Sequence, residues 1–138
     1  MRILSIFCFL FMSVTSGFAQ DTLTIEHQPI IIDASYAGGN TEDLYYYVNN
    51  NFNYNNVKKE DIPAKAKKQP YFVFYVVFAI SEDGKAFEFS PKEIGAENSF
   101  YKEAVRVIAS TRWNPALVDN EYKKQFLVVP IKANIGDF

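Results

Sequence analysis

The chain is poor in the residues that most catalytic and metal sites require, since its 138 residues include one cysteine and one histidine. The single cysteine, Cys8, has no partner for a disulfide and lies in an apolar run rather than in a metal-ligand motif. The only histidine, His27, has Glu26 beside it, but neighbouring residues of an extended chain point to opposite faces. The sequence therefore predicts no catalytic residues, no metal site and no cofactor.

Other signatures of catalysis and of nucleic-acid binding are also missing. The pair Gly38-Gly39 is not followed by the glycine spacing of a phosphate-binding loop, and no serine has the glycine flanks of a nucleophile elbow. The net charge is −2, from 14 basic and 16 acidic residues, so a general attraction to nucleic acid is not expected. We therefore expect a binding module that is not an enzyme and does not bind nucleic acid.

The first 19 residues have the pattern of a secretory signal peptide. Arg2 gives a short positive region, residues 3–14 are mostly apolar, and the small residues Gly17 and Ala19 precede Gln20. The apolar run is shorter than the roughly 20 residues that a membrane-spanning helix needs. We expect cleavage after Ala19 and export to the periplasm or another extracytoplasmic space. The mature chain would then have no transmembrane span and no cysteine.

The mature chain, residues 20–138, is long enough for one domain with its own core. We divide it into an N-terminal extended arm, residues 20–35, and a domain over residues 36–138. In the arm, Leu23 and Ile25 alternate with polar residues before three consecutive isoleucines, which favours a short strand.

Two amphipathic helices are predicted. Asn40 can cap the first, and Glu42 and Asp43 bring negative charge to its first turn, where the helix dipole favours it. Its apolar face contains Leu44, Tyr47, Val48 and Phe52. The second helix begins near Asn98 or Ser99. Its predicted inner stripe is Phe100, Ala104, Val107, Ile108 and Thr111, with Glu103 and Arg106 outside the stripe.

Three strands are predicted. Residues 71–80 are all apolar or aromatic and give the central strand, and Asp83-Gly84 predicts a hairpin to a returning strand at residues 86–90. Residues 125–135 give the last strand, which Pro130 places at a sheet edge because it has no amide proton.

This order of elements predicts an α+β fold in which two helices pack on one face of a three-stranded antiparallel sheet. Both faces of the central strand are apolar, so both should be covered. Either the N-terminal arm or a second copy of the chain, as a homodimer, would cover the face away from the helices.

A lysine-rich segment separates the first helix from the central strand. Its basic residues are Lys58, Lys59, Lys65, Lys67 and Lys68. Such a cluster is typical of a patch for anionic lipid or polymer, or of a solvated loop. The asparagines and prolines around it favour the loop.

Several short motifs follow one another through the domain. Tyr36-Ala37-Gly38-Gly39 precedes the first helix, Trp113-Asn114-Pro115-Ala116 follows the second, and Val129-Pro130-Ile131 lies in the last strand. In this order, from Tyr36 to about Ile135, the chain resembles the TonB C-terminal domain family in its stand-alone, Bacteroidetes-type form. The residues that match the family pattern are Gly38, Gly39, Arg106, Trp113 and Pro115.

The resemblance implies a function by strand pairing. TonB-like C-terminal domains bind an extended segment of an outer-membrane transporter along a sheet edge, through backbone hydrogen bonds and side-chain pockets. It implies that this chain binds such a protein segment, or pairs with itself, and is linked to outer-membrane transport. The implied edge residues are Gln125, Leu127, Val129, Ile131, Lys132 and Ala133. The alternative is a structural or assembly subunit that self-associates through the aromatic face of the sheet.

The resemblance also gives the family-pattern residues their expected roles. The two glycines allow a tight turn into the first helix, and Pro115 sets the direction of the chain. Arg106 pairs with an acidic group, caps carbonyl groups or stays solvated. Trp113 either pins the second helix to the sheet or is exposed as an anchor for a partner. An energy-transducing TonB protein has an uncleaved anchor and a proline-rich spacer. Because we expect a cleaved signal peptide here and the sequence shows no such spacer, we do not expect this chain to transmit force.

Overall fold

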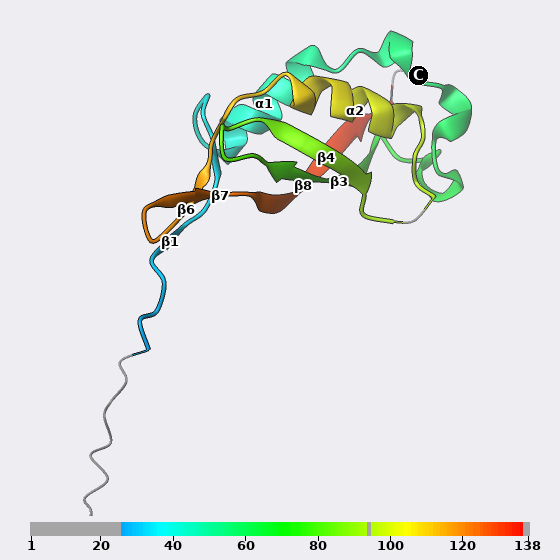
Figure 1. The fold of residues 1–138 in the computed structure, drawn as a ribbon. Helices are drawn as coiled ribbons and strands as arrows, with labels where there is room; N and C mark the ends of the chain where they lie inside the picture. Colours follow the sequence, from blue (N-terminus) through cyan, green and yellow to red (C-terminus); the bar gives the residue numbers. More distant parts are fainter. Residues whose placement is uncertain (1–25, 94, 137–138) are drawn as a thin grey trace, which may run out of the picture.

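The computed structural model describes residues 26–93 and 95–136. These residues form an α+β structure with two α-helices and three antiparallel sheets (Figure 1). The main sheet has the order β4-β3-β8, and its strands span Tyr71–Ile80 (β3), Ala86–Pro91 (β4) and Gln125–Asn134 (β8). The predicted α+β class is confirmed, as is the position of residues 71–80 between the other two strands. The predicted signal peptide, residues 1–19, and residues 20–25 of the predicted arm lie outside the described residues.

Both helices begin where the sequence predicts. α1 spans Thr41–Asn51, and its cap is reciprocal: Asn40 accepts the Asp43 amide at 3.0 Å, and the Asp43 carboxylate accepts the Asn40 amide at 2.8 Å. α2 spans Ser99–Ala109, and the Asn98 side chain accepts the Tyr101 amide at 3.0 Å. These short polar side chains satisfy amides that have no partner within the helix.

Two small sheets join the N-terminal arm to the segment after α2. Their strands are β1 (Ile31–Ile32), β2 (Ser35–Tyr36), β5 (Trp113–Asn114), β6 (Ala116–Val118) and β7 (Glu121–Lys123). β1 pairs with β6, β6 pairs with β7, and β2 pairs with β5, all antiparallel. A turn at Asp119 and Asn120, both with positive φ, joins β6 to β7. The sequence does not predict β5, β6 or β7, because strands this short show no readable alternation.

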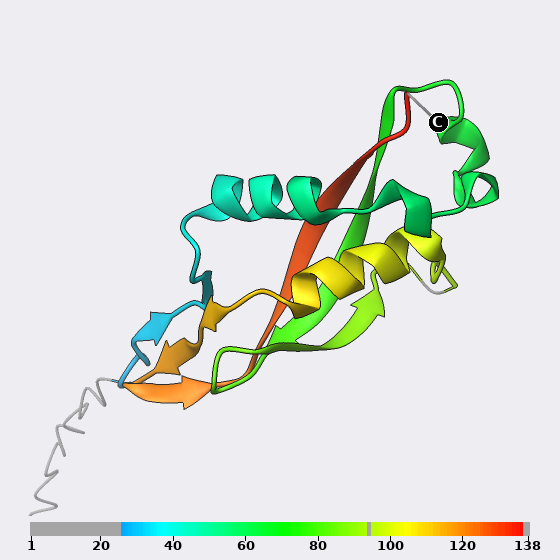
Figure 2. The same ribbon diagram turned by 90° about the horizontal axis from the view of Figure 1, so that it is seen from above.

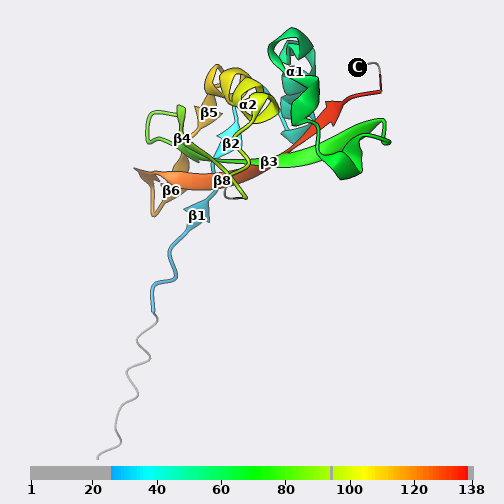
Figure 3. The same cartoon turned by 90° about the vertical axis from the view of Figure 1, so that its right-hand side faces the viewer.

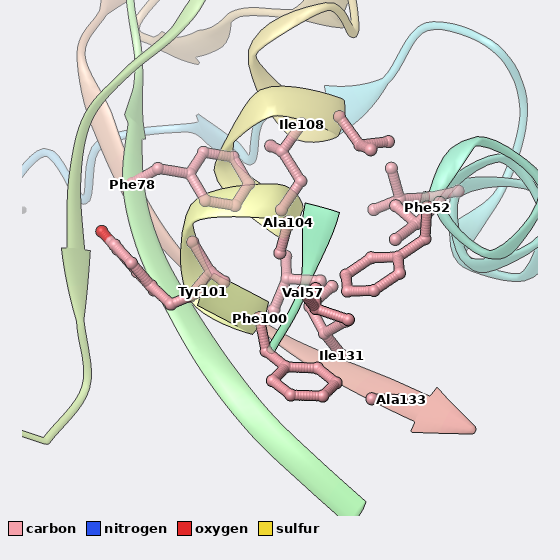
Figure 4. Close-up of a cluster of buried hydrophobic side chains, with 14 of the residues drawn as sticks. Phe52, Val57, Phe78, Phe100, Tyr101, Ala104, Ile108, Ile131 and Ala133 are labelled. Carbon is pink, nitrogen blue, oxygen red and sulfur yellow. The ribbon is translucent and has the colours of Figure 1, made fainter. Parts of the chain in front are cut away.

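The core lies between the helices and the main sheet. Figure 3 shows α1 and α2 on the same side of this sheet, and Figure 4 shows apolar side chains gathered in the core. From β3, the side chains of Val76, Phe78 and Ile80 point into it and have no exposed surface. Burial of a side chain of this size stabilises the fold by about 1.5–3 kcal/mol. Four residues of the predicted inner stripe lie on α2 and are buried: Phe100, Ala104, Val107 and Ile108. Thr111 is also buried, but it follows the helix, which ends at Ala109 and not near Arg112.

The opposite face of the main sheet is open. Tyr71, Val73 and Tyr75 of β3 keep 45%, 45% and 42% of their surface exposed. The described part of the arm does not lie on this face, because β1 and β2 pair with β6 and β5 and the chain before β1 leads away from the sheet (Figure 1). The expectation that the arm covers this face is therefore wrong for residues 26–35, and cover by a second copy stays a prediction.

The lysine-rich segment is more regular than a solvated loop. It follows α1 as three short 3₁₀ helices, Tyr54–Asn56, Lys59–Asp61 and Ala64–Ala66. Its five lysines are exposed, as expected. Val57, Ile62 and Ala66, however, are buried in the core. The segment is thus a part of the packed structure that carries its charges on the outside.

Candidate functional site

β8 lies at one edge of the main sheet, as Pro130 predicts, and its backbone groups alternate in direction. The Ile135 amide donates to the Pro70 carbonyl at 2.8 Å, on the β3 side. The preceding amide, of Asn134, instead donates to the Tyr54 hydroxyl at 2.8 Å. In an antiparallel ladder this direction alternates at every residue. The even-numbered residues of β8 therefore turn their amides away from β3.

The outward amides show that only a short part of β8 could pair with an added strand. Phe126, Val128 and Lys132 turn their amides outward, and Pro130 has no amide to present. Tyr54 occupies the Asn134 amide at the far end. At the near end, the Gln125 side chain binds the Ala34 amide at 2.6 Å. The edge that can accept a further strand is thus centred on residues 128–132.

Five of the six predicted edge residues turn their backbone groups toward β3 and not toward the free side of β8. Gln125, Leu127, Val129, Ile131 and Ala133 are odd-numbered, so their backbone groups pair with β3 and their side chains lie on the helix side. Lys132 alone combines an outward amide with an exposed side chain.

Val128 is not among the six predicted edge residues, but it turns its amide outward and its side chain is 51% exposed. Pro130 indicates which residues of β8 turn their amides outward, because a proline is tolerated on an edge strand where its missing amide would point outward. That fixes an outward phase for residues 128 and 132.

A groove runs between this edge and α1, which crosses β8 in Figure 2. One hollow, of about 280 Å³, is lined by Tyr45, Val48, Asn49, Val73, Pro130, Ile131 and Lys132. A second, of about 340 Å³, includes Leu44 and Tyr45 of α1 together with residues 127–129 of β8. Tyr45 borders both hollows. The groove is mostly apolar and suits the side chains of an extended segment lying along the edge.

Trp113 belongs to the packed structure and not to the surface. Its side chain is 7% exposed, and its ring lies 5.5 Å from the Phe78 ring and 5.9 Å from the Tyr36 ring, centroid to centroid. Its indole N–H donates to the Thr111 hydroxyl at 2.7 Å. Of the two roles expected for this tryptophan, packing is confirmed.

The two glycines of the family pattern shape the turn before α1. Gly39 has φ of 140°, a conformation that side chains with a Cβ rarely adopt. A Cβ on Gly38 would lie 2.5 Å from the Tyr36 ring. Pro115, half-buried, separates β5 from β6. These residues position elements, and none of them lines the β8 groove except Gly39, at its end.

Arg106 and Glu103 form an ion pair in which the carboxylate is buried. The Arg106 guanidinium donates to the Glu103 carboxylate at 3.1 Å and to the Asn51 carbonyl at 2.8 Å. Glu103 also accepts the Asn53 amide and the Asn56 side chain, both at 2.8 Å. Of the three roles left open for Arg106, the structure shows both pairing with an acidic group and a bond to a carbonyl group.

The expectation that Glu103 faces solvent is wrong, since it is 3% exposed. Its hydrogen bonds with Arg106, more than any other contact, lower its pKa to about 2. The buried carboxylate is fully paired, which is why α2 tolerates it. The cluster connects the end of α1 to α2.

His27 contacts Asp119 at 3.1 Å and is exposed. Within residues 26–93 and 95–136, no three histidine, cysteine, aspartate or glutamate side chains gather as metal ligands. No helix in this part of the chain is long and apolar enough to cross a membrane.

No protein-family model matches this chain, and neither a curated protein nor a solved structure matches it. The resemblance to TonB C-terminal domains is carried by the motifs alone.

Proposed function

We propose that this chain is a non-catalytic, extracytoplasmic binding module that takes up an extended segment of a partner protein as an added strand at the β8 edge. The observation that carries the proposal is the pair of outward amides at Val128 and Lys132, beside an apolar groove. An added strand would lie about 4.8 Å from β8 and bond to these two residues.

The side chains of the segment supply the selectivity. Pro130 offers a carbonyl group and no amide, so few backbone bonds form, and each contributes only about 0.5–1.5 kcal/mol. Alternate side chains of the added strand would point toward α1, into the hollows beside Tyr45. Binding should therefore be reversible and should depend on apolar residues at alternate positions of the partner.

We further propose that the fold is of the TonB C-terminal type and that the partner segment belongs to an outer-membrane protein. The support is the placement of α1 and α2 on one side of the β4-β3-β8 sheet, with the last strand at an edge (Figure 3). The packing of Trp113 between α2 and the sheet fits the same pattern.

Proline substitution tests the proposal. Partner segments are first captured from an extracytoplasmic extract with the chain that begins at Gln20, and are then titrated as synthetic peptides. Val128→Pro and Lys132→Pro each remove one outward amide and should weaken binding at least tenfold. Glu82→Pro, in the tip of the β3–β4 hairpin, is the matched control and should bind normally. Full affinity in both edge variants would rule out strand addition at β8.

A second candidate function is supported by the open face of the main sheet. Phe126 and Val128 of β8 are 56% and 51% exposed and extend the apolar surface formed by Tyr71, Val73 and Tyr75. A patch of this kind on a small domain is typical of an interaction surface. The chain would then be an assembly subunit that self-associates through this face. Sedimentation velocity tests this self-association. A dimer that the Val73→Lys substitution dissociates would support it, and a monomer at high concentration would contradict it.

A further inference from the structure

β4 is shorter than the strand it pairs with, and this leaves a gap in the main sheet. β8 pairs with all of β3, from Tyr71 to Ile80. β4 pairs with β3 only from Val76 onward and ends at Pro91. On the β4 side, the first half of β3 therefore has no neighbouring strand among the described residues.

The backbone of β3 points into this gap at odd-numbered residues. The amide of Ser81, just after β3, donates to the Lys85 carbonyl at 2.9 Å on the β4 side. Alternation along the strand then turns the backbone groups of Val73 and Tyr75 to the same side. Within residues 26–93 and 95–136, no strand pairs with Val73 on this side, and the β3–β4 register begins at Val76, opposite Pro91.

The core is incomplete beneath the gap. Phe72 and Phe74 point to the helix side, as Val76 and Phe78 do, but they remain half-buried where β4 no longer runs alongside. A hollow of about 340 Å³ lies there, bordered by residues 72–75, Ala66, Ala96 and Tyr101. Its apolar lining fits the inward-facing side chains of one additional strand.

Basic side chains stand at the rim of the hollow. Lys65 and Lys92 border it, against Glu93 as the single acidic residue of the lining. The Lys92 ammonium group lies 4.5 Å from the centre of the Tyr75 ring, which is on the open face of the sheet. An incoming segment with an acidic side chain would meet complementary charge here.

We propose that this gap, the β3 slot, is a second strand-addition site, distinct from the β8 edge. Its occupant is an extended segment of a partner protein with alternating apolar residues and an acidic residue facing the lysines. The segment continues the line of β4 along β3, so that the established β3–β4 pairing extends over Val73 and Tyr75. Its apolar side chains complete the core beside Phe72 and Phe74.

Amide hydrogen exchange of the chain from Gln20, followed by NMR, tests the slot. Without ligand, the Val73 and Tyr75 amides should exchange much faster than those of Phe72 and Phe74, which pair with β8. A phage-displayed library of random decapeptides supplies the probe. Selected peptides should slow exchange at Val73 and Tyr75 at least tenfold and should be rich in acidic and apolar residues.

Three variants separate the two sites. Ala96→Phe fills the hollow and Lys92→Glu reverses the charge at its rim, and each should weaken such peptides at least tenfold. Val128→Pro, at the β8 edge, should leave their affinity unchanged. Peptides that protect only the Val128 and Lys132 amides would overturn the slot and support the β8 proposal. Protection at neither edge, or occupation of the slot by a second copy in a dimer, would also overturn it.

Discussion

The Trp113 indole N–H donates to the Thr111 hydroxyl at 2.7 Å, and that hydroxyl donates in turn to the Ile108 carbonyl at the end of α2. Both side chains are buried, so this pair of bonds connects the last turn of the helix to β5. Thr111→Val leaves the indole N–H without a partner in an apolar site. We expect a loss of about 1–3 kcal/mol in the free energy of unfolding.

Urea denaturation measures this loss, and Thr111→Ser is the matched control because it keeps the hydroxyl. The serine variant should lose less stability than the valine variant. Equal stability of Thr111→Val and the unmodified chain would show that the bond to Trp113 contributes nothing.

Glu103 should make stability depend on pH. Its pKa is lowered to about 2 in the folded state, chiefly by the hydrogen bonds with Arg106, from an ordinary value of 4.5. Because the folded pKa lies below the unfolded one, the ionised carboxylate stabilises the fold. This contribution, of order 3 kcal/mol, is complete above pH of about 4.5 and is lost as pH falls toward about 2.

Glu103→Gln tests this by thermal denaturation across that pH range. The variant should be less stable at pH 7, and its stability should fall less steeply between pH 5 and 2. Glu82→Gln, at an exposed position of the hairpin tip, should keep the original pH profile. If the stability of the Glu103→Gln variant falls with pH as steeply as that of the unmodified chain, other carboxylates control acid unfolding.

The two faces of β3 should respond differently to the same charge. Val76 has no exposed surface, so Val76→Asp buries an unpaired carboxylate and should cost several kcal/mol, about 3–5. Val73, on the same strand, is 45% exposed on the open face, and Val73→Asp should change stability by less than about 1 kcal/mol. Similar unfolding midpoints for the two variants would contradict the assignment of the faces.

Cleavage of a signal peptide predicts a defined N-terminus for the exported protein. If residues 1–19 are a cleaved signal peptide, the native protein should begin at Gln20 and should be found outside the cytoplasm. Intact-mass analysis of the protein from its native cells measures this directly. A mass that corresponds to the whole chain from Met1 would contradict cleavage.

Local signals in the sequence were sufficient for the main elements. The caps at Asn40 and Asn98 start the helices where predicted, because a capping side chain needs only neighbours three residues away. The apolar run of β3 and the Asp83-Gly84 turn predict the central hairpin, because these signals also depend only on neighbouring residues. Pro130 identifies β8 as an edge strand through its missing amide.

Contacts between distant residues could not be read in this way. β1 and β2 pair with strands more than seventy residues later, and each is only two residues long. The burial of Glu103 depends on Asn53 and Asn56, which reach it from the turn after α1. A charged residue on a helix predicts exposure unless such partners are known.

The sequence by itself determined the helices, the central hairpin and the edge position of the last strand, because each depends on backbone preferences over a few residues. Only the tertiary structure decided which residues of an edge are usable. Pro130 already indicates the outward phase of Val128 and Lys132, but the limits of the edge follow from the contacts of Asn134 with Tyr54 and of Gln125 with Ala34. The β3 slot exists because β4 stops at Pro91 while β3 continues. Both depend on how strands of unequal length align, and that alignment is set by packing across the whole sheet.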